Sequence, residues 1–433
     1  MRRRDFFGVA ALAAAACRSR PATKPNFLFI LADQWRADAL GVAGNTFVKT
    51  PNVDKLASEG VRFANAYSPM ALCTPTRASL LTGVYPITHN LRGNVYKIDT
   101  VFGDPQYKLE PHYPGLLKSH GWKTAYIGKW HLGEKDPGFF DYYNGYNSQW
   151  PHWLGERDNS PYRPDVETED AMRWMEENQE GPFFLEVSYY PPHDPYNPPQ
   201  RYVDMYEGQS IPHVEYYAAC TAIDWNIGRL LEKVDKLGLR DNTVVIFVSE
   251  HGETFAERPL STNKRVGYEE SAKVPWIMRF PHVIPHDEVY EGGVVTIDLM
   301  PTLLDLAGIP IPARVEGHTR LPELLKGDLG WKQPVIQMNV TQPRVMGGPY
   351  DERMVRFEEW KLILRKFTPD APPETKAHAA ELYNLTADPG ETQNVFESPA
   401  NRAKVTELAG YLRKWGEKIG DPLSVELTSP LTG

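Results

Sequence analysis

The segment Asn26–Ala32 (NFLFILA) is an almost unbroken apolar run that stops at Asp33 and Gln34. A short run of this kind is typical of a strand buried on both faces, as in a parallel sheet. Three later segments share the design, and each is followed at once by polar or charged side chains. They are Thr124–Gly128 before Lys129-Trp130-His131, Phe183–Ser188 before Tyr189–His193, and Thr243–Ser249 before Glu250-His251-Gly252-Glu253.

Helical patterns separate these predicted strands. Thr50-Pro51 begins a helix that ends by Gly60, and residues 168–178 and about 213–237 have amphipathic periodicity. The alternation predicts an α/β fold, namely a doubly wound, mainly parallel sheet sandwiched by helices. In such sheets, ligands bind outside the carboxyl ends of the strands. We therefore expect the polar residues after the four runs to meet at one edge of the sheet.

The 433 residues exceed the size at which a single hydrophobic core stops growing. We expect the large sheet domain to span residues 25–335 and a smaller α+β subdomain to span residues 336–433. In the smaller part, Arg353–Phe357 and Lys361–Arg365 have the pattern of short antiparallel strands, and a terminal helix is expected near 401–418.

The N-terminal sequence MRRRDFFGVAALAAAAC has the form of an export signal, with a basic start and an Ala-rich apolar stretch. Its paired arginines resemble a twin-arginine signal. The apolar run is too short to span a bilayer. Ala14-Ala15-Ala16-Cys17 resembles a lipoprotein cleavage box without the usual Leu, so Cys17 is a candidate lipid anchor. With residues 1–24 as signal and linker, we expect an exported protein, either periplasmic or a membrane-anchored lipoprotein.

Composition and charge narrow the function classes. The apolar fraction of 41% and the charged fraction of 24% are ordinary for a soluble globular protein. The net charge of −9 argues against nonspecific nucleic-acid binding, which needs a basic surface. An anionic substrate would need a local cluster of cations. The only cysteines are Cys17, Cys73 and Cys220, so a disulfide framework is not expected. Cys220 lies in a helical pattern and is expected in the core.

The segment Leu72–Gly83 (LCTPTRASLLTG) places Cys73 at the start of a predicted helix. Pro75 suits a first helical turn, and Gly83 suits a helix end. Free N–H groups at a helix N-terminus favour negative charge, so a thiol there would be acidic. The Cys-His-Asn signature of a thiol protease does not accompany it.

Cys-x-Pro-x-Arg followed by Ala-Ser-Leu-Leu-Thr-Gly resembles the signature of type I sulfatases, in the alkaline-phosphatase-like superfamily. In that family a maturation enzyme converts the cysteine to formylglycine. Asp33-Gln34 and Glu250-His251 resemble the two metal-binding motifs, although most members have Asp in place of Glu250. Further matches are the Lys129/His131 pair, His193 before Asp194-Pro195, Lys264 ahead of Tyr268-Glu269-Glu270, and the C-terminal segment 381–391.

The resemblance implies a mechanism of sulfate ester hydrolysis. The aldehyde at residue 73 would be hydrated to a diol nucleophile. Calcium, or alternatively magnesium, would be held by residue 73 and by Asp33, Gln34, Glu250 and His251, although His251 could instead contact the substrate. Arg77, one helical turn after Cys73, would orient the diol. Lys129 and Lys264 would bind sulfate oxygens, His193 would protonate the leaving alcohol, and His131 would accept a proton when sulfate is released.

Two other functions remain open. Asp33-Gln34-Trp35-Arg36 also resembles phosphonate monoester hydrolases, which implies a phosphonate or phosphate ester hydrolase as one alternative. The other is an inactive lipoprotein that binds sulfated glycans, suggested only by Glu250. For an active sulfatase we expect a sulfated carbohydrate substrate.

The aromatic residues Trp150, Trp153 and Tyr162 lie in an insertion at about 136–165 that either recognises the sugar or only packs. A plain loop is the preferred interpretation of Arg92-Gly93-Asn94. We expect structural or solvated roles for the remaining loop histidines, which are His89, His112, His152 and His213.

Overall fold

The computed structural model describes residues 23–261, 263–340 and 350–432. The predicted export signal, with Cys17, lies outside these residues. The larger sheet has eight strands in the order β4-β3-β5-β1-β6-β7-β2-β8. Strand β1 (Asn26–Asp33) lies at its centre, parallel to both β5 (Phe183–Pro192) and β6 (Thr243–Ser249). The apolar run that ends at Asp33 is therefore the central strand, and every residue of it is buried.

The rest of the sheet is parallel except at one strand. Strand β3 (Lys123–Lys129) pairs in parallel with β5 and with the edge strand β4 (Tyr142–Tyr146). On the other side, β7 (Trp276–Arg279) is antiparallel to both of its neighbours, β6 and β2 (Val61–Tyr67). The edge strand β8 (Glu288–Val295) is again parallel to β2. The predicted α/β class with a mainly parallel sheet is confirmed.

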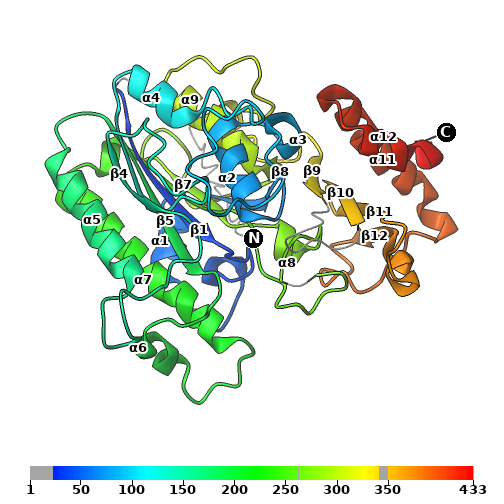
Figure 1. Cartoon of the computed structure of the whole chain (residues 1–433), viewed down its shortest axis with the longest axis horizontal. Helices are drawn as coiled ribbons and strands as arrows, with labels where there is room; N and C mark the ends of the chain where they lie inside the picture. The colour runs from blue at the N-terminus through cyan, green and yellow to red at the C-terminus, as the bar shows by residue number, and fades with distance from the viewer. Residues whose placement is uncertain (1–22, 262, 341–349, 433) are drawn as a thin grey trace, which may run out of the picture.

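Helices cover both faces of this sheet (Figure 1). Leu28 and Ile30 of β1 face one core, which α1 (Pro51–Ser58), α5 (Arg163–Glu177) and α7 (Val214–Lys236) cover. Phe27, Phe29 and Leu31 alternate with them and face the opposite core. The helices on that second side are α2 (Cys73–Thr82), α4 (Tyr113–Ser119) and α9 (Leu299–Leu306). Cys220 is buried within α7, as expected.

Shorter helices occupy the loops. They are α3 (Pro86–His89), α6 (Gln200–Val203), α8 (Glu269–Ala272) and α10 (Leu321–Lys326). Helix α5 begins at Arg163, five residues before the predicted start, because Pro164 occupies its first turn and the apolar periodicity only becomes regular further on.

A second, antiparallel sheet has the order β12-β11-β10-β9 and lies at one end of the molecule (Figure 1). Its strands are β9 (Val335–Asn339), β10 (Tyr350–Phe357), β11 (Trp360–Phe367) and β12 (Ala380–Asn384). The two strands predicted from sequence are thus β10 and β11, and they pair as an antiparallel hairpin. The predicted domain boundary at 335/336 falls inside β9, and it stays a prediction.

Two helices cover one face of the small sheet. Helix α11 (Arg402–Ile419) matches the predicted terminal helix, and α12 (Pro422–Thr432) packs against it. Helix α12 could not be predicted from sequence, because its segment PLSVELTSPLT has two prolines and weak helical periodicity. This helix is held by its contacts with α11 and by the turn at Asp421.

Buried ion pairs join the small sheet to the large domain. Lys361 of β11 is fully buried, and its ammonium lies 2.6 Å from Glu269 and 2.8 Å from Glu391. Arg356 of β10 lies 3.2 Å from the same Glu269, which begins α8. Each of these buried charges therefore has an opposite charge in contact, which limits the cost of removing it from water.

In the part of the chain that the structure describes, no helix is both long enough and apolar enough to cross a membrane.

The Arg353–Asp421 pair generates a stability prediction. Both side chains are buried, with Nε and Nη2 of Arg353 at 2.6 and 2.9 Å from the two carboxylate oxygens. Asp421→Ala would leave the guanidinium buried without its partner, so we expect a loss of about 3–5 kcal/mol in the free energy of unfolding. Urea denaturation followed by circular dichroism measures this. The control is Glu417→Ala, which breaks an exposed pair with Arg413 and should cost under about 1 kcal/mol. Equal losses in the two variants would contradict the prediction.

Candidate active site

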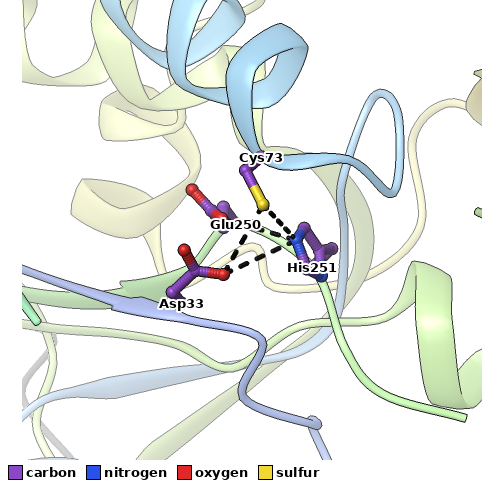
Figure 2. A group of neighbouring side chains, drawn as sticks. All are labelled: Asp33, Cys73, Glu250 and His251. Carbon is purple, nitrogen blue, oxygen red and sulfur yellow. Dashed lines mark hydrogen bonds and ion pairs between the residues drawn. The ribbon is translucent and has the colours of Figure 1, made fainter. Parts of the chain in front are cut away.

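Four side chains meet at the carboxyl edge of the large sheet. Asp33, Cys73, Glu250 and His251 are all buried, and one potential metal-ligand atom from each lies within 4.8 Å of the others. Figure 2 shows the four side chains pointing toward a common centre. The Cys73 sulfur lies 3.2 Å from Nε2 of His251 and 3.7 Å from Oδ1 of Asp33. These are four of the ten site residues predicted from sequence.

The fold accounts for this meeting. Asp33 is the last residue of β1 and Glu250 directly follows β6, and since these strands are adjacent and parallel, both carboxylates lie at the same edge. Cys73 is the first residue of α2, so free N–H groups of the first turn surround it. Asn94 accepts a hydrogen bond from one of them, the Thr74 N–H, at 3.1 Å. The loop at 92–94 is thus more than a plain loop, because Asn94 anchors the first turn of the helix that carries Cys73.

Two cations from other elements neutralise the two carboxylates. Nε of Arg77 lies 2.5 Å from Glu250, and its Nη2 lies 3.5 Å from Asp33. Lys129, the last residue of β3, contacts the same Asp33 oxygen, Oδ2. Burial alone would raise the pKa of Asp33, but Lys129 and the nearby cations hold it well below its usual range. The pKa of Lys129 is raised by the same pairing despite its burial.

The donor set fits a hard divalent cation. Carboxylate oxygens are the ligands that calcium and magnesium prefer. Neither carboxylate oxygen of buried Glu250 accepts a hydrogen bond from any residue that the structure describes. Oε2 is in ion-pair contact with Arg77, and a buried carboxylate that lacks hydrogen bonds gains from a further partner such as a cation. The longer Glu250 arm therefore still presents ligand oxygens where Asp is usual.

Gln34 makes two side-chain hydrogen bonds to other site residues, and its predicted role as a metal ligand stays a prediction. Its side-chain oxygen accepts a hydrogen bond from Lys264 at 2.5 Å, and its amide nitrogen donates to Glu253. Ligation of a metal by Gln34 would require it to leave Lys264. Glu253 also accepts hydrogen bonds from Tyr196 Oη at 2.5 Å and Phe255 N at 2.6 Å. The sequence analysis assigned Glu253 no role of its own, although it stands in the same four-residue motif as Glu250.

Lys264 and His193 form a pair beside the cysteine. Nζ of Lys264 lies 3.0 Å from Nε2 of His193 and 3.7 Å from the Cys73 sulfur. Nδ1 of His193 lies 2.7 Å from the backbone oxygen of Asp194. Burial, followed by the charge of Lys264, places the pKa of His193 well below its usual range. In the free protein His193 is therefore neutral, and Nε2 accepts a hydrogen bond from Lys264.

His131 is a neutral base without a bonded partner. It is buried, and neither ring nitrogen has a hydrogen-bond partner among the described residues. Its pKa is far below normal because of burial and the charge of Lys129. The hydroxyl of Thr74 donates to the His131 backbone oxygen at 2.9 Å, which ties His131 to the helix that carries Cys73.

The other loop histidines have structural contacts, as expected. His89 bonds Ser79 of α2 at 2.9 Å, His112 caps α4 by accepting from Gly115 N, and His213 pairs with exposed Glu257 at 2.7 Å. His152 is buried and packs edge-on against the ring of Tyr190, with ring centroids 4.9 Å apart.

Comparisons with known proteins agree with this geometry. The family model described as sulfatase matches residues 25–309, and that described as N-sulphoglucosamine sulphohydrolase, C-terminal, matches residues 261–418. An ulvan-active sulfatase of Formosa agariphila is 34% identical over 92% of this chain and 82% of its own length. An N-acetylglucosamine-6-O-sulfatase of Bacteroides thetaiotaomicron is 25% identical over 95% of this chain and 90% of its own.

A solved structure shares the fold. It is a protein in complex with its substrate D-glucosamine-2-N,6-O-disulfate, and it superimposes with a TM-score of 0.79 at 23% identity, covering 92% of this chain and 99% of the other.

The four-residue cluster generates a metal-binding prediction. Calcium chloride at millimolar concentration should raise the melting temperature, because a ligand that binds only the folded state stabilises it. Glu250→Gln removes one ligand charge, so we expect calcium affinity to fall by at least about tenfold, measured from the calcium dependence of the melting temperature. The control is Glu167→Gln, which alters another buried carboxylate whose oxygens have no hydrogen-bond partner in the described structure. An unchanged calcium response in Glu250→Gln would exclude this cluster as the metal site.

Proposed function

Because the chain belongs to the sulfatase family, and is therefore a sulfate ester hydrolase, we propose that it removes sulfate from carbohydrates with residue 73 as the nucleophile, after oxidation of Cys73 to formylglycine by a maturation enzyme. The observation that carries the proposal is the set of buried cations around this cysteine. Arg77 and Lys129 pair with Asp33, and Lys264 lies 3.7 Å from the sulfur. A small anionic group beside residue 73 would meet all three.

Two groups would complete the site. Formylglycine, as its hydrate, would supply the hydroxyl nucleophile that a thiol cannot provide. Asp33, Glu250, His251 and residue 73 would hold a calcium or magnesium ion. Gln34 would be a further ligand if it leaves Lys264. The ion would polarise the sulfate and acidify the attacking hydroxyl.

The basic side chains would stabilise the charge of the reacting sulfate. Lys129 and Lys264 are buried, so their charges act through a poorly screened environment on sulfate oxygens near Cys73. Both already contact acceptors, Asp33 and Gln34. A bound sulfate would compete with these acceptors for the two lysines, and a metal ion would compete with the lysines for the acceptors. Arg77 pairs with both carboxylates one helical turn after residue 73, and from there it would orient residue 73.

Proton transfer falls to the two histidines. His193 would protonate the departing alcohol, with the ammonium of Lys264 held against its Nε2. The negative charge of a bound sulfate ester would also raise the histidine pKa from its low value in the free protein. His131 is neutral and has an unoccupied ring nitrogen, as a base needs in order to accept a proton when sulfate is released.

A carbohydrate substrate is supported by the relatives' named substrates and by one surface feature. The insertion expected at 136–165 contains two kinds of aromatic residue. Trp153 and Tyr162 are buried against each other, 5.2 Å between ring centroids, and only pack. Trp150 is 47% exposed, and its ring stacks on Tyr146 at 5.1 Å. An exposed aromatic face held in this way suits contact with a sugar ring.

This platform is connected to the catalytic residues through Tyr190. The backbone N–H of Gln149, next to Trp150, donates to the Tyr190 hydroxyl at 3.3 Å. The Tyr190 ring in turn lies 4.9 Å from the His193 ring, and the ammonium of Lys129 lies 4.1 Å above it. A sugar bound at the nucleophile would therefore have Trp150 close to its neighbouring unit.

Export to the periplasm, with Cys17 as a candidate lipid anchor, is part of the proposal and is supported by the N-terminal sequence alone.

The first functional prediction concerns residue 73. Mass spectrometry of the peptide containing residue 73, from protein produced with its maturation enzyme, should find the mass of formylglycine. Cys73→Ala should lower kcat on a sulfate ester by at least about 10³-fold, because the nucleophile is lost. The matched control is Cys220→Ala, which alters the other buried free cysteine and should retain activity.

Full turnover with an unmodified thiol, or in Cys73→Ala, would contradict this mechanism. Rates on a sulfate and a phosphonate ester of the same phenol compare the two hydrolase activities. Faster phosphonate hydrolysis would favour the alternative function implied by Asp33–Arg36.

The second functional prediction concerns Trp150. Trp150→Ala should lower kcat/KM on a sulfated oligosaccharide about 5- to 13-fold, since an aromatic contact of roughly 1–1.5 kcal/mol is lost. Activity on a small aryl sulfate should change less than about twofold. The control Trp225→Ala removes an equally exposed tryptophan from α7, and it should affect neither substrate. Equal losses on both substrates would mean that Trp150 only supports the fold.

A further inference from the structure

Arg265 differs from every other buried arginine in the described structure. Each of the others has a carboxylate within ion-pair distance, and they are Arg77, Arg279, Arg320, Arg353, Arg356 and Arg365. Arg265 is 8% exposed, and the only hydrogen bond it makes with a described residue is a long one, 3.4 Å, from Nη2 to the backbone oxygen of Val340. Among the residues that the structure describes, its positive charge therefore has no negative partner.

An unpaired buried cation is unfavourable for the folded protein. Desolvating a charge costs several kcal/mol unless an opposite charge compensates. In agreement, burial lowers the pKa of Arg265, and the groups that act in the opposite direction are only the hydroxyls of Tyr350 and Tyr96. The backbone adds to the cost, because Arg265 has a φ of 75°, in the left-handed region that non-glycine residues rarely adopt. Unfavourable features of this kind are concentrated at binding sites.

Arg265 lies beside the catalytic cluster. It follows Lys264, whose ammonium reaches His193 and Cys73. Tyr96, one of the two hydroxyl-bearing residues near Arg265, packs its ring 5.5 Å from that of His131.

The hydrogen-bond partner of Arg265 leads to the same place. Val340 follows Asn339, whose side-chain oxygen accepts the N–H of Ala71, two residues before the nucleophile. Arg265 therefore lies on the flank of the site that faces the small sheet. Trp150, by comparison, belongs to the insertion that contacts Tyr190.

We infer that Arg265 binds a second anionic group of the substrate, a carboxylate or a further sulfate carried on the sugar next to the reacting sulfate. The inference rests on the proposed function and specifies its substrate class. A guanidinium presents a planar fork of N–H donors that matches the paired oxygens of either anion. The overall charge of the protein is negative, so attraction of a doubly charged substrate needs such a local cation.

Lys129 and Lys264 do not serve this purpose. Both contact acceptors of the catalytic cluster, Asp33 and Gln34, and would be engaged by the reacting sulfate. Arg265 contacts neither of these acceptors, so its charge remains for another group on the substrate.

A set of matched substrates tests this inference. The first pair is a sulfated disaccharide that contains a uronic acid and its carboxyl methyl ester, which differ only by one negative charge. The second pair is a monosulfated and a disulfated form of one sugar. Arg265→Gln should lower kcat/KM about 10- to 100-fold on whichever substrate carries the recognised second anion, the usual effect of losing a charged hydrogen bond. The singly charged partner should change less than about twofold.

Two variants and one physical measurement separate binding from folding. Arg265→Lys should retain part of the preference, because it keeps the charge and loses the fork. The control Arg62→Gln changes another arginine whose pKa burial lowers, in β2 and away from the site, and it should leave both preferences unchanged. The melting temperature of Arg265→Gln should equal or exceed that of the wild type, because an unpaired buried charge is removed. A lower melting temperature with equal losses on all substrates would assign Arg265 a structural role and overturn the inference.

Calorimetry with the desulfated uronic acid disaccharide and with free inorganic sulfate measures binding without turnover. Weaker binding of one of them to Arg265→Gln than to the wild type supports the inference and identifies the anion. Unchanged binding of both, together with unchanged substrate preferences, overturns it. A wild-type protein that hydrolyses none of the sulfate esters would instead contradict the proposed function, and the calorimetric comparison would still decide the role of Arg265.

Discussion

The balance of buried charge at the carboxyl edge of the large sheet is the constraint on which the rest of the site depends. Parallel strands β1 and β6 bring Asp33 and Glu250 to the same place, fully removed from water. Two buried carboxylates this close repel each other and lose their hydration, so both can stay ionised only if cations surround them. Arg77 from α2 and Lys129 from β3 supply that charge. Helix α2, which begins at Cys73, and the central strands are thus held together by the same groups to which the proposed function gives a role toward the substrate.

The sequence predicted the part of this arrangement that local rules determine. Strands buried on both faces appear as apolar runs, and the residues that follow them must lie at the sheet edge, so Asp33, Lys129, His193 and Glu250 could be located without coordinates. The helical spacing of Cys73 and Arg77 likewise follows from one short segment. The family resemblance gave these residues chemical roles, and the structure adds their distances and charge states.

Residues whose role depends on contacts distant in sequence could not be predicted in this way. Asn94 caps α2 from a loop 20 residues away, and Glu253 accepts hydrogen bonds from Gln34 and Tyr196. Helix α12 depends on packing against α11. None of these has a local pattern that separates it from an ordinary loop or polar residue. Arg265 depends on distant contacts most of all, because what distinguishes it is the lack of a carboxylate partner among the described residues. That lack can be recognised only when the ion pairs of all buried arginines are compared in the structure.

The substitution of Glu for the usual Asp at position 250 has a consequence for the metal ion. The extra methylene extends the carboxylate until it lies 2.5 Å from Nε of Arg77, so this oxygen is shared between the arginine and any bound cation. The other oxygen lies 3.4 Å from His251 and faces the cluster. If a divalent cation binds here, the flexible coordination geometry of calcium would suit such a shared carboxylate better than magnesium, which demands near-ideal octahedral coordination. Under the proposed function, Arg77, which would orient residue 73, would then also set how Glu250 binds a metal ion, so the two roles could not vary independently.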